Sequence, residues 1–279
     1  MSFAAGAIPV ALGIVYWGGW PLALLVAAVG VLGARELFEF AARRGIAPIR
    51  PLGYLAAAAM APLALLAATD DRAAGVLGTY GSHLAAGWIL AVLTGCLFAR
   101  RPTDRPLEAA AVTVLGALYA GALPAFLLGL RHSGYGERSW PGAWLVFFPL
   151  VVTWVCDTAA MFAGRAIGGP KLWPGVSPGK TWAGAVAGVL AALLVAPLYD
   201  ALVFDRSGLE VPRGAALAIA GVLSVVGQIG DLAESLFKRE VGLKDSSALI
   251  PGHGGVLDRF DSLYFVVPTA AAMYRLIGL

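Results

Sequence analysis

Residues 143–164 read AWLVFFPLVVTWVCDTAAMFAG, a long apolar run in which Asp157 is the only charged side chain. A membrane-spanning helix needs about 20 largely apolar residues, because its backbone polar groups must be satisfied within the helix itself. The run is long enough, so we predict a spanning helix here. An acid in the middle of such a helix costs about 2.5–3.5 kcal/mol on insertion scales. Asp157 therefore needs a compensating partner, and a cation is the expected one.

The rest of the chain has the same apolar character. Its 279 residues are 59% hydrophobic and 13% charged, with a mean hydropathy of +0.79, whereas soluble domains carry about 25% charged residues. Similar apolar runs occupy residues 3–18, 20–41, 52–69, 83–99, 107–130, 182–203, 214–233 and 262–279. We expect an all-α, polytopic membrane bundle of about nine transmembrane helices. Residues 1–279 would form a single integral membrane domain, with N-terminal helices in 1–140 and catalytic helices and cytosolic loops in 141–279.

Composition and cysteine usage disfavour several other classes of protein. The formal net charge of +3 is small and dispersed, so no nucleic acid is expected as a partner. Cys96 and Cys156 both lie in apolar runs without metal-type neighbours, which is typical of small buried side chains rather than of a disulfide or zinc site. The opening residues lack a basic leader and favour a first spanning helix over a cleaved signal peptide.

The placement of basic residues predicts the orientation in the membrane. If successive connections alternate between the two sides, residues 35–51, 100–106, 165–181 and 234–261 share one side, and they hold most of the 20 basic residues. By the positive-inside rule this side is cytoplasmic, which places the N-terminus inside and the C-terminus outside. We expect a multi-pass protein of the plasma membrane with its polar site facing the cytoplasm.

The most polar segment, residues 231–261, reads DLAESLFKREVGLKDSSALIPGHGGVLDRFD. If the preceding helix continues through it, Asp231, Ser235 and Lys238 share one helix face. The glycines beside His253 allow backbone N–H groups to approach an anion closely. A second polar segment on the predicted cytoplasmic side, RAIGGPKLWPGVSPGKT at 165–181, offers a hydroxyl and an ammonium close together at Ser177 and Lys180.

These residue types suit transfer chemistry on phosphates. Two carboxylates from separate helices, Asp231 and Asp258, offer oxygen ligands for a hard cation such as Mg²⁺ rather than zinc. Neighbouring lysines and arginines are the side chains that bind polyphosphate oxygens. Taken singly, the basic residues also fit positive-inside anchors, and the acids fit a solvated helix face. A secondary transporter, with intramembrane acids along a permeation path, is a further alternative.

Residues 235–261 also carry a family resemblance. Ser235-Leu-Phe-Lys238-Arg239, Lys244-Asp245 and His253-Gly254-Gly255-Val-Leu-Asp258-Arg259-Phe-Asp261 follow one another with a spacing that resembles the phosphatidate cytidylyltransferases, also called CDP-diacylglycerol synthases. The segment from Asp157 through Ser177-Pro-Gly-Lys180-Thr-Trp182 is similar to the second polar region of that family. One departure is Ala183, where the family usually has Glu, which puts a ligand or pairing role of that position in doubt.

The resemblance implies that phosphatidate and CTP react to give CDP-diacylglycerol and pyrophosphate, with Mg²⁺ required. It also implies a second, K⁺-like cation and a possible homodimer. Asp231 and Asp258 would hold the metal, with Asp157 and Asp261 as supporting acids, and Lys180 and Lys238 would join the two metal ligands as catalytic residues. The expected substrate-binding set is Ser177, Lys180, Ser235, Lys238, Arg239, Lys244, Asp245, His253, Gly254, Gly255 and Arg259. Because the motif does not read acyl chains, a cytidylyltransferase or kinase for a polyprenol or an ether lipid stays open.

Overall fold

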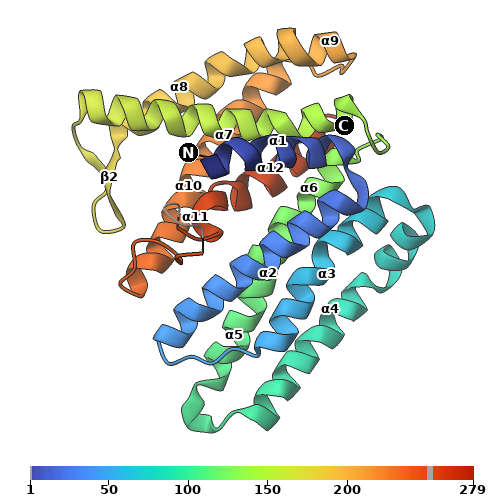
Figure 1. Ribbon diagram of the computed structural model, residues 1–279, viewed down its shortest axis with the longest axis vertical. Coiled ribbons are helices and arrows are strands. Elements are labelled where there is room, and N and C mark those ends of the chain that lie inside the picture. The colour runs from blue at the N-terminus through green and yellow to red at the C-terminus, as the bar shows by residue number, and fades with distance from the viewer. Residues whose placement is uncertain (1, 250–253) are drawn as a thin grey trace.

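The computed structural model describes residues 2–249 and 254–279, and their secondary structure is almost entirely helical (Figure 1). His253 lies outside the described residues. The elements in chain order are α1 (Ser2–Trp17), α2 (Gly19–Arg43), α3 (Arg50–Thr69), α4 (Asp71–Ala99), η1 (Pro102–Asp104), α5 (Pro106–Ala117), η2 (Leu118–Ala122), α6 (Leu123–Arg131), α7 (Trp140–Ile167), β1 (Lys171–Trp173), β2 (Ser177–Thr181), α8 (Trp182–Tyr199), η3 (Asp200–Phe204), α9 (Asp205–Ser207), α10 (Arg213–Glu240), α11 (Leu257–Phe260) and α12 (Leu263–Leu276).

Seven helical segments in the described chain are long and apolar enough to cross a membrane. They are Gly19–Arg43, Arg50–Thr69, Asp71–Ala99, Pro106–Arg131, Trp140–Ile167, Trp182–Ser207 and Gly214–Glu240. The predicted all-α membrane bundle is therefore confirmed, but the count of nine is not. The first and last expected spans correspond to α1 and α12, which have 16 and 14 residues and are short for a spanning helix.

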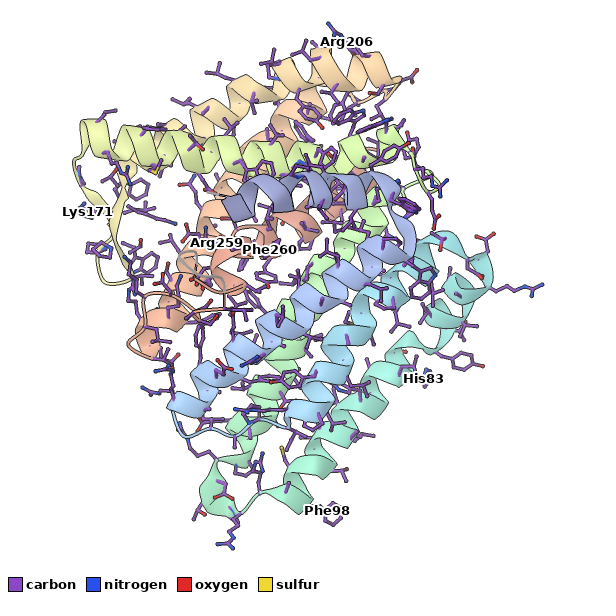
Figure 2. All side chains as sticks on the ribbon, in the orientation of Figure 1. His83, Phe98, Lys171, Arg206, Arg259 and Phe260 are labelled. Carbon is purple, nitrogen blue, oxygen red and sulfur yellow. The ribbon has the colours of Figure 1, made fainter. Side chains whose placement is uncertain are left out.

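The fourth span begins earlier than its hydropathy indicates. Helix α4 starts at Asp71 rather than near residue 83, because the Asp70 side chain caps it. Asp70 Oδ1 accepts hydrogen bonds from the backbone N–H groups of Arg72 at 2.8 Å and Ala73 at 3.0 Å. A capping acid satisfies the N–H groups that a helix start leaves unpaired. Phe98 at the other end of α4 is 84% exposed and points away from the bundle, as expected of a lipid-facing side chain (Figure 2).

The helices form two groups joined through α10 and α12. Helices α2, α3, α4 and α5 lie side by side, whereas α7 and α8 cross above them in Figure 1. Helix α10 packs on α7, α8 and α12, and α12 also packs on α6. Phe148, Leu223 and Val266 are fully buried where these helices meet. The connection between α2 and α3, the β1–β2 hairpin and the segment after α10 all lie on the left side of the molecule in Figure 1.

Small residues set the close approach of α7 and α8. A Cβ on Gly184 would lie 2.6 Å from the carbonyl oxygen of Ala160, and one on Gly188 would lie 2.9 Å from that of Cys156. Only glycine permits this backbone separation, as in many membrane helix pairs. Because Asp157 directly follows Cys156 and the hairpin directly precedes α8, this contact brings Asp157 toward the polar hairpin.

The π-helical segment η2 lies directly before α6, next to Pro124 in its first turn. Proline cannot donate a backbone hydrogen bond, and π-helical turns absorb such local interruptions. Gly121 within η2 approaches α3 so closely that a Cβ there would lie 2.6 Å from the Cα of Ala57. The distortion thus tightens the packing of the N-terminal helices.

Candidate active site

The first polar contact of the candidate site joins the hairpin to α10. Lys180 Nζ lies 2.6 Å from Asp231 Oδ2, and both side chains are 28% exposed. Ser235 Oγ lies 3.4 Å from Asp231 Oδ1 and is a long hydrogen-bond donor to it. The two polar segments singled out in the sequence therefore meet, with residues 165–181 against residues 231–261.

Local contacts hold the hairpin in this position. Strands β1 and β2 pair antiparallel, and Thr181 caps α8 through a hydrogen bond from Gly184 N to its Oγ1 at 3.1 Å. Arg239 Nε donates to the carbonyl oxygen of Val176 at 3.2 Å, and its Nη1 donates to that of Leu243 at 2.5 Å. Arg239 was predicted to bind substrate, and in the structure its guanidinium fastens the hairpin to the end of α10.

The second polar contact centres on Asp258. Lys238 Nζ donates to Asp258 Oδ1 at 2.7 Å, while Oδ2 accepts from Gly255 N at 2.8 Å and from Ser246 N at 2.7 Å. Burial alone would raise the pKa of Asp258. Hydrogen bonds from Gly255, Lys238 and Ser246 outweigh that effect and hold its pKa below the ordinary value. Asp258 is thus a fixed carboxylate.

Lys238 links this contact to a buried acid on its own helix. Its Nζ lies 2.5 Å from Glu234 Oε2 as well as 2.7 Å from Asp258 Oδ1. The Glu234 side chain is fully buried, and its Oε1 has no hydrogen-bond partner among the described residues. A buried ammonium between two carboxylates leaves an excess of negative charge around α10.

The remaining two predicted acids lie on the Asp231 side. Burial, followed by the negative charge of Asp231, raises the pKa of Asp261 to about 7, with Asp157 adding to the effect. Asp258 and Asp261 thus have different charged neighbours, Lys238 for Asp258 and Asp231 for Asp261. Gly230 makes this approach possible, since a Cβ there would lie 2.8 Å from the carbonyl oxygen of Asp261.

Among the described residues, acids outnumber cations around this part of the site. Asp157, Asp231 and Asp261 lie within electrostatic range of one another. Lys180 forms an ion pair with Asp231 and is also within electrostatic range of Asp157. No group of three or more His, Cys, Asp or Glu side chains in the described chain is arranged to hold a metal ion by itself. The predicted Mg²⁺ ligands therefore stay a prediction.

The model of the cytidylyltransferase family matches residues 1–277. The chain belongs to the cytidylyltransferase family. A Brucella suis biovar 1 (strain 1330) protein named phosphatidate cytidylyltransferase is 40% identical over 215 residues, covering 69% of this chain and 72% of the relative. An Arabidopsis thaliana protein named phosphatidate cytidylyltransferase 5, chloroplastic, is 35% identical over 294 residues, covering 95% of this chain and 69% of the relative.

A third relative covers less of the chain. The phosphatidate cytidylyltransferase of Haemophilus influenzae (strain ATCC 51907 / DSM 11121 / KW20 / Rd) is 43% identical over 153 residues, which are 53% of this chain and 51% of that protein. These matches confirm the family resemblance that residues 235–261 indicated, and they show that this cytidylyltransferase is an enzyme. A cytidylyltransferase uses a nucleotide substrate, so the matches disfavour the alternative of a secondary transporter.

Several predicted substrate-binding residues of this cytidylyltransferase lie at the surface beside these contacts. Lys244, Asp245 and Arg259 are exposed, and Ser177 is half-buried at the start of β2. Arg259 is labelled on α11 in Figure 2. Gly254 has φ of +77°, a conformation that favours glycine, and Gly255 donates its N–H to Asp258. The glycine turn therefore orders a carboxylate in the structure.

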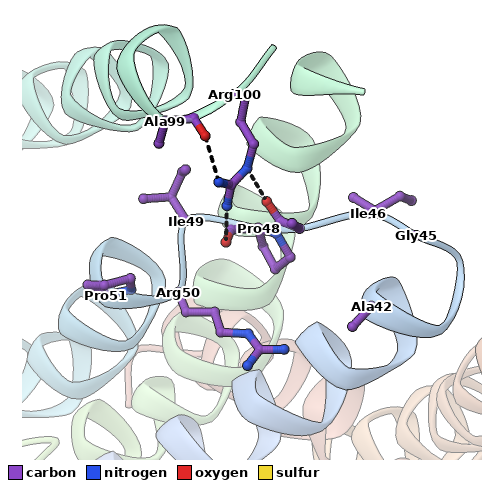
Figure 3. A pocket seen from close by; sticks show the side chains of 10 residues that line it. Ala42, Gly45, Ile46, Pro48, Ile49, Arg50, Pro51, Ala99 and Arg100 are labelled. Atoms are coloured by element: carbon purple, nitrogen blue, oxygen red, sulfur yellow. Dashed lines mark hydrogen bonds between the residues drawn. The ribbon is translucent and has the colours of Figure 1, made fainter. Parts of the chain in front are cut away.

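A pocket of about 610 Å³ lies elsewhere in this cytidylyltransferase, at the connection between α2 and α3 (Figure 3). Arg100 closes part of it by donating from Nε to Ala47 O at 2.9 Å and from Nη2 to Pro48 O at 3.3 Å. None of the predicted site residues lines this pocket. Its chemistry is therefore separate from that of the two lysine–aspartate pairs.

One buried acid next to the candidate site was not identified from the sequence. Glu36 on α2 is 2% exposed and accepts hydrogen bonds from the segment that holds Asp258. The available signal was an acid inside the apolar run 20–41, which is the same signal that identified Asp157. Arg35 and Glu39 are charged as well, so the sequence of residues 35–39 also fits a polar helix end.

Proposed function

We propose that this chain is a phosphatidate cytidylyltransferase, which transfers the cytidylyl group of CTP to phosphatidate and releases CDP-diacylglycerol and pyrophosphate. Two independent observations support the proposal. Three relatives with 35–43% identity carry that name. The structure also presents two lysine–aspartate pairs, Lys180–Asp231 and Lys238–Asp258, in the polar segments at the ends of membrane helices.

The two paired lysines are the main structural support for cytidylyl transfer. The phosphate of phosphatidate is already an anion, so its attack on the α-phosphorus of CTP requires no strong general base. The difficulty is the repulsion between two anions and the charge that develops on departing pyrophosphate. Lys180 and Lys238, each within 2.7 Å of a carboxylate oxygen, can exchange that oxygen for a phosphate oxygen and stabilise the developing charge.

The acidic surroundings of these lysines fit a Mg²⁺ ion. Asp231, Asp261 and Asp157 supply only oxygen donors and exceed the nearby positive charge, which suits a hard divalent cation bound together with substrate phosphates. We propose Asp231 and Asp258 as its ligands, with Asp157 and Asp261 in support. Mg²⁺ bound there would neutralise phosphate charge and hold the reacting groups in line. A second, K⁺-like cation is proposed on the family resemblance alone.

The membrane placement follows from the same arrangement. A diacyl substrate can stay in the leaflet while its headgroup meets a soluble nucleotide at the helix ends. We propose that this end faces the cytoplasm, because the segments that meet there hold most of the basic residues. That orientation places the N-terminus inside and the C-terminus outside in the plasma membrane. A homodimer is proposed on the family resemblance only.

The experiment that tests the function uses purified protein, phosphatidate, MgCl₂ and CTP labelled on the α-phosphate in one arm and on the γ-phosphate in another. The proposal expects the α-label in a CDP-lipid and the γ-label in pyrophosphate. Transfer of the γ-label to the lipid would instead show a kinase. Parallel arms with polyprenyl phosphate and an ether analogue of phosphatidate test the acceptor, and a strong preference for either one would overturn the assignment of phosphatidate.

A further inference from the structure

Glu36 is a buried carboxylate whose partners come from the far end of the chain. It lies on α2 in the N-terminal half and is 2% exposed. Among the described residues it has four hydrogen-bond donors, which belong to 246–247 and 256–257: Ser246 Oγ at 2.8 Å, Ser247 Oγ at 2.7 Å, Val256 N at 2.9 Å and Leu257 N at 2.8 Å. One α2 side chain thus binds two short stretches of the C-terminal half, residues 246–247 and 256–257.

The described donors to this carboxylate are all neutral. Among the described residues, no Lys, Arg or His nitrogen lies within 4.0 Å of Glu36, whereas Glu39 one turn later pairs with Arg35 at 2.9 Å on the exposed side of α2. A buried carboxylate without its hydrogen bonds is strongly destabilised. Glu36 therefore stabilises the positions of its four described donors, and those donors in turn stabilise the buried carboxylate.

The same donors lead directly to Asp258. Ser246 N donates to Asp258 Oδ2 at 2.7 Å, and Ser246 Oγ lies 2.8 Å from both Asp258 Oδ2 and Glu36 Oε2. Leu257, whose N–H binds Glu36, immediately precedes Asp258 in the chain. A Cβ on Gly255 would collide with Ser246 Oγ and Glu36 Oε1, so the packing at this point is tight.

We infer that Glu36 is a positioning residue that sets the orientation of the Asp258 carboxylate by anchoring residues 246–247 and 256–257 to α2. The inference rests on the proposed function, because it assigns Glu36 a role in the same site. If Glu36 has this role, a helix of the N-terminal half helps to build the active site, although α2 lies far from residues 235–261 in the sequence. Glu36 would act on Asp258 through Ser246 and Leu257.

The substitution Glu36→Gln tests this role at constant side-chain size. Each carboxylate oxygen accepts one backbone N–H, Oε1 from Val256 and Oε2 from Leu257. A glutamine amide has one oxygen and one NH₂ group. In either orientation its NH₂ faces a backbone N–H, so one anchor must break. Glu39→Gln on the exposed face of α2 is the matched control.

Two measurements are made on the full-length protein in detergent. Hydrogen–deuterium exchange without substrate should show faster exchange in peptides containing Val256 and Leu257 for Glu36→Gln, with Glu39→Gln unchanged. Steady-state assays should show kcat lowered at least tenfold and the Mg²⁺ concentration for half-maximal activity raised severalfold, with a smaller change in KM for CTP. A purely structural role would lower the yield and melting temperature but leave the Mg²⁺ dependence of the folded fraction unchanged.

A pair of serine variants keeps the test decisive if Glu36→Gln does not fold. Both hydroxyls bind Glu36, but only that of Ser246 also contacts Asp258. Ser246→Ala should raise the Mg²⁺ requirement more than Ser247→Ala. Equal Mg²⁺ requirements, or exchange at Val256 and Leu257 unaffected by Glu36→Gln, would overturn the inference. Absence of CDP-lipid synthesis in the wild type would instead refute the proposed function, and the exchange data would still decide whether Glu36 anchors the segment.

Discussion

Lys180 on β2 and Asp231 on α10 form an ion pair with an Nζ–Oδ2 distance of 2.6 Å. This contact joins the two polar segments of a mostly apolar chain. Lys238 and Asp258 form a second pair at 2.7 Å, so each proposed metal ligand already has a lysine beside it. We interpret the two pairs as the two ends of one phosphate-binding site.

Lys180 is the first target for substitution. A charge-assisted hydrogen bond to a phosphate contributes about 1.5–3 kcal/mol, so Lys180→Ala should raise KM for CTP or phosphatidate roughly 10- to 100-fold. Lys171→Ala is the matched control, because Lys171 lies on the same hairpin and is exposed (Figure 2). Initial rates across both substrate concentrations measure the effect. Equal kinetic constants for the two variants would show that the hairpin is not part of the active site.

Gly230 tests whether the close approach of α10 and α12 matters for activity. A methyl group at Gly230 would lie 2.8 Å from Asp261 O and 3.0 Å from Phe265 Cδ2. Gly230→Ala should therefore displace Asp261 from Asp231 and lower kcat about tenfold or more. Gly221→Ala on the same helix meets only Leu193 Cδ2 at 3.4 Å, so it should be nearly neutral. Comparable activity of the two variants would show that the close spacing between Gly230 and Asp261 is not required for activity.

His132 predicts a pH dependence of stability at the other end of the molecule. Its Nε2 accepts the N–H of Gly19 at 3.0 Å, and its Nδ1 lies 3.2 Å from Tyr135 O. Burial, and then the charge of Arg131, lower the pKa of His132 below its ordinary 6.5. The unfolded chain therefore binds a proton at higher pH than the folded one, and stability falls as the pH drops below about 6.5.

The melting temperature between pH 7.5 and pH 5.5 measures this effect. The wild type should lose more thermal stability over that range than His132→Gln, which keeps a hydrogen-bond acceptor without titrating. His83→Gln should behave like the wild type, since His83 is exposed on α4 (Figure 2). Parallel losses in all three proteins would show that His132 does not control the pH dependence.

The helical membrane bundle follows from composition, since long apolar runs leave few alternatives. Hydropathy could not locate the start of α4, because the Asp70 cap acts through backbone geometry rather than apolarity. Motif spacing identified Lys180 and Asp231, and the structure shows the two residues in contact. Motif spacing could not reveal Glu36, because its hydrogen-bond partners lie more than 200 positions away in the sequence. Motif spacing also predicted that Arg239 binds substrate, whereas in the structure Arg239 binds backbone carbonyl groups of the protein itself.

The central claim is that Asp231 and Asp258 together support Mg²⁺-dependent transfer from CTP to phosphatidate. Its most direct test is Mg²⁺-dependent incorporation of α-labelled CTP into lipid by Asp231→Asn and Asp258→Asn, with exposed Asp71→Asn as the control. We predict at least about a 100-fold loss of turnover in each site variant at saturating Mg²⁺, with normal folding and a fully active control. Near-normal turnover by either folded site variant would contradict the account.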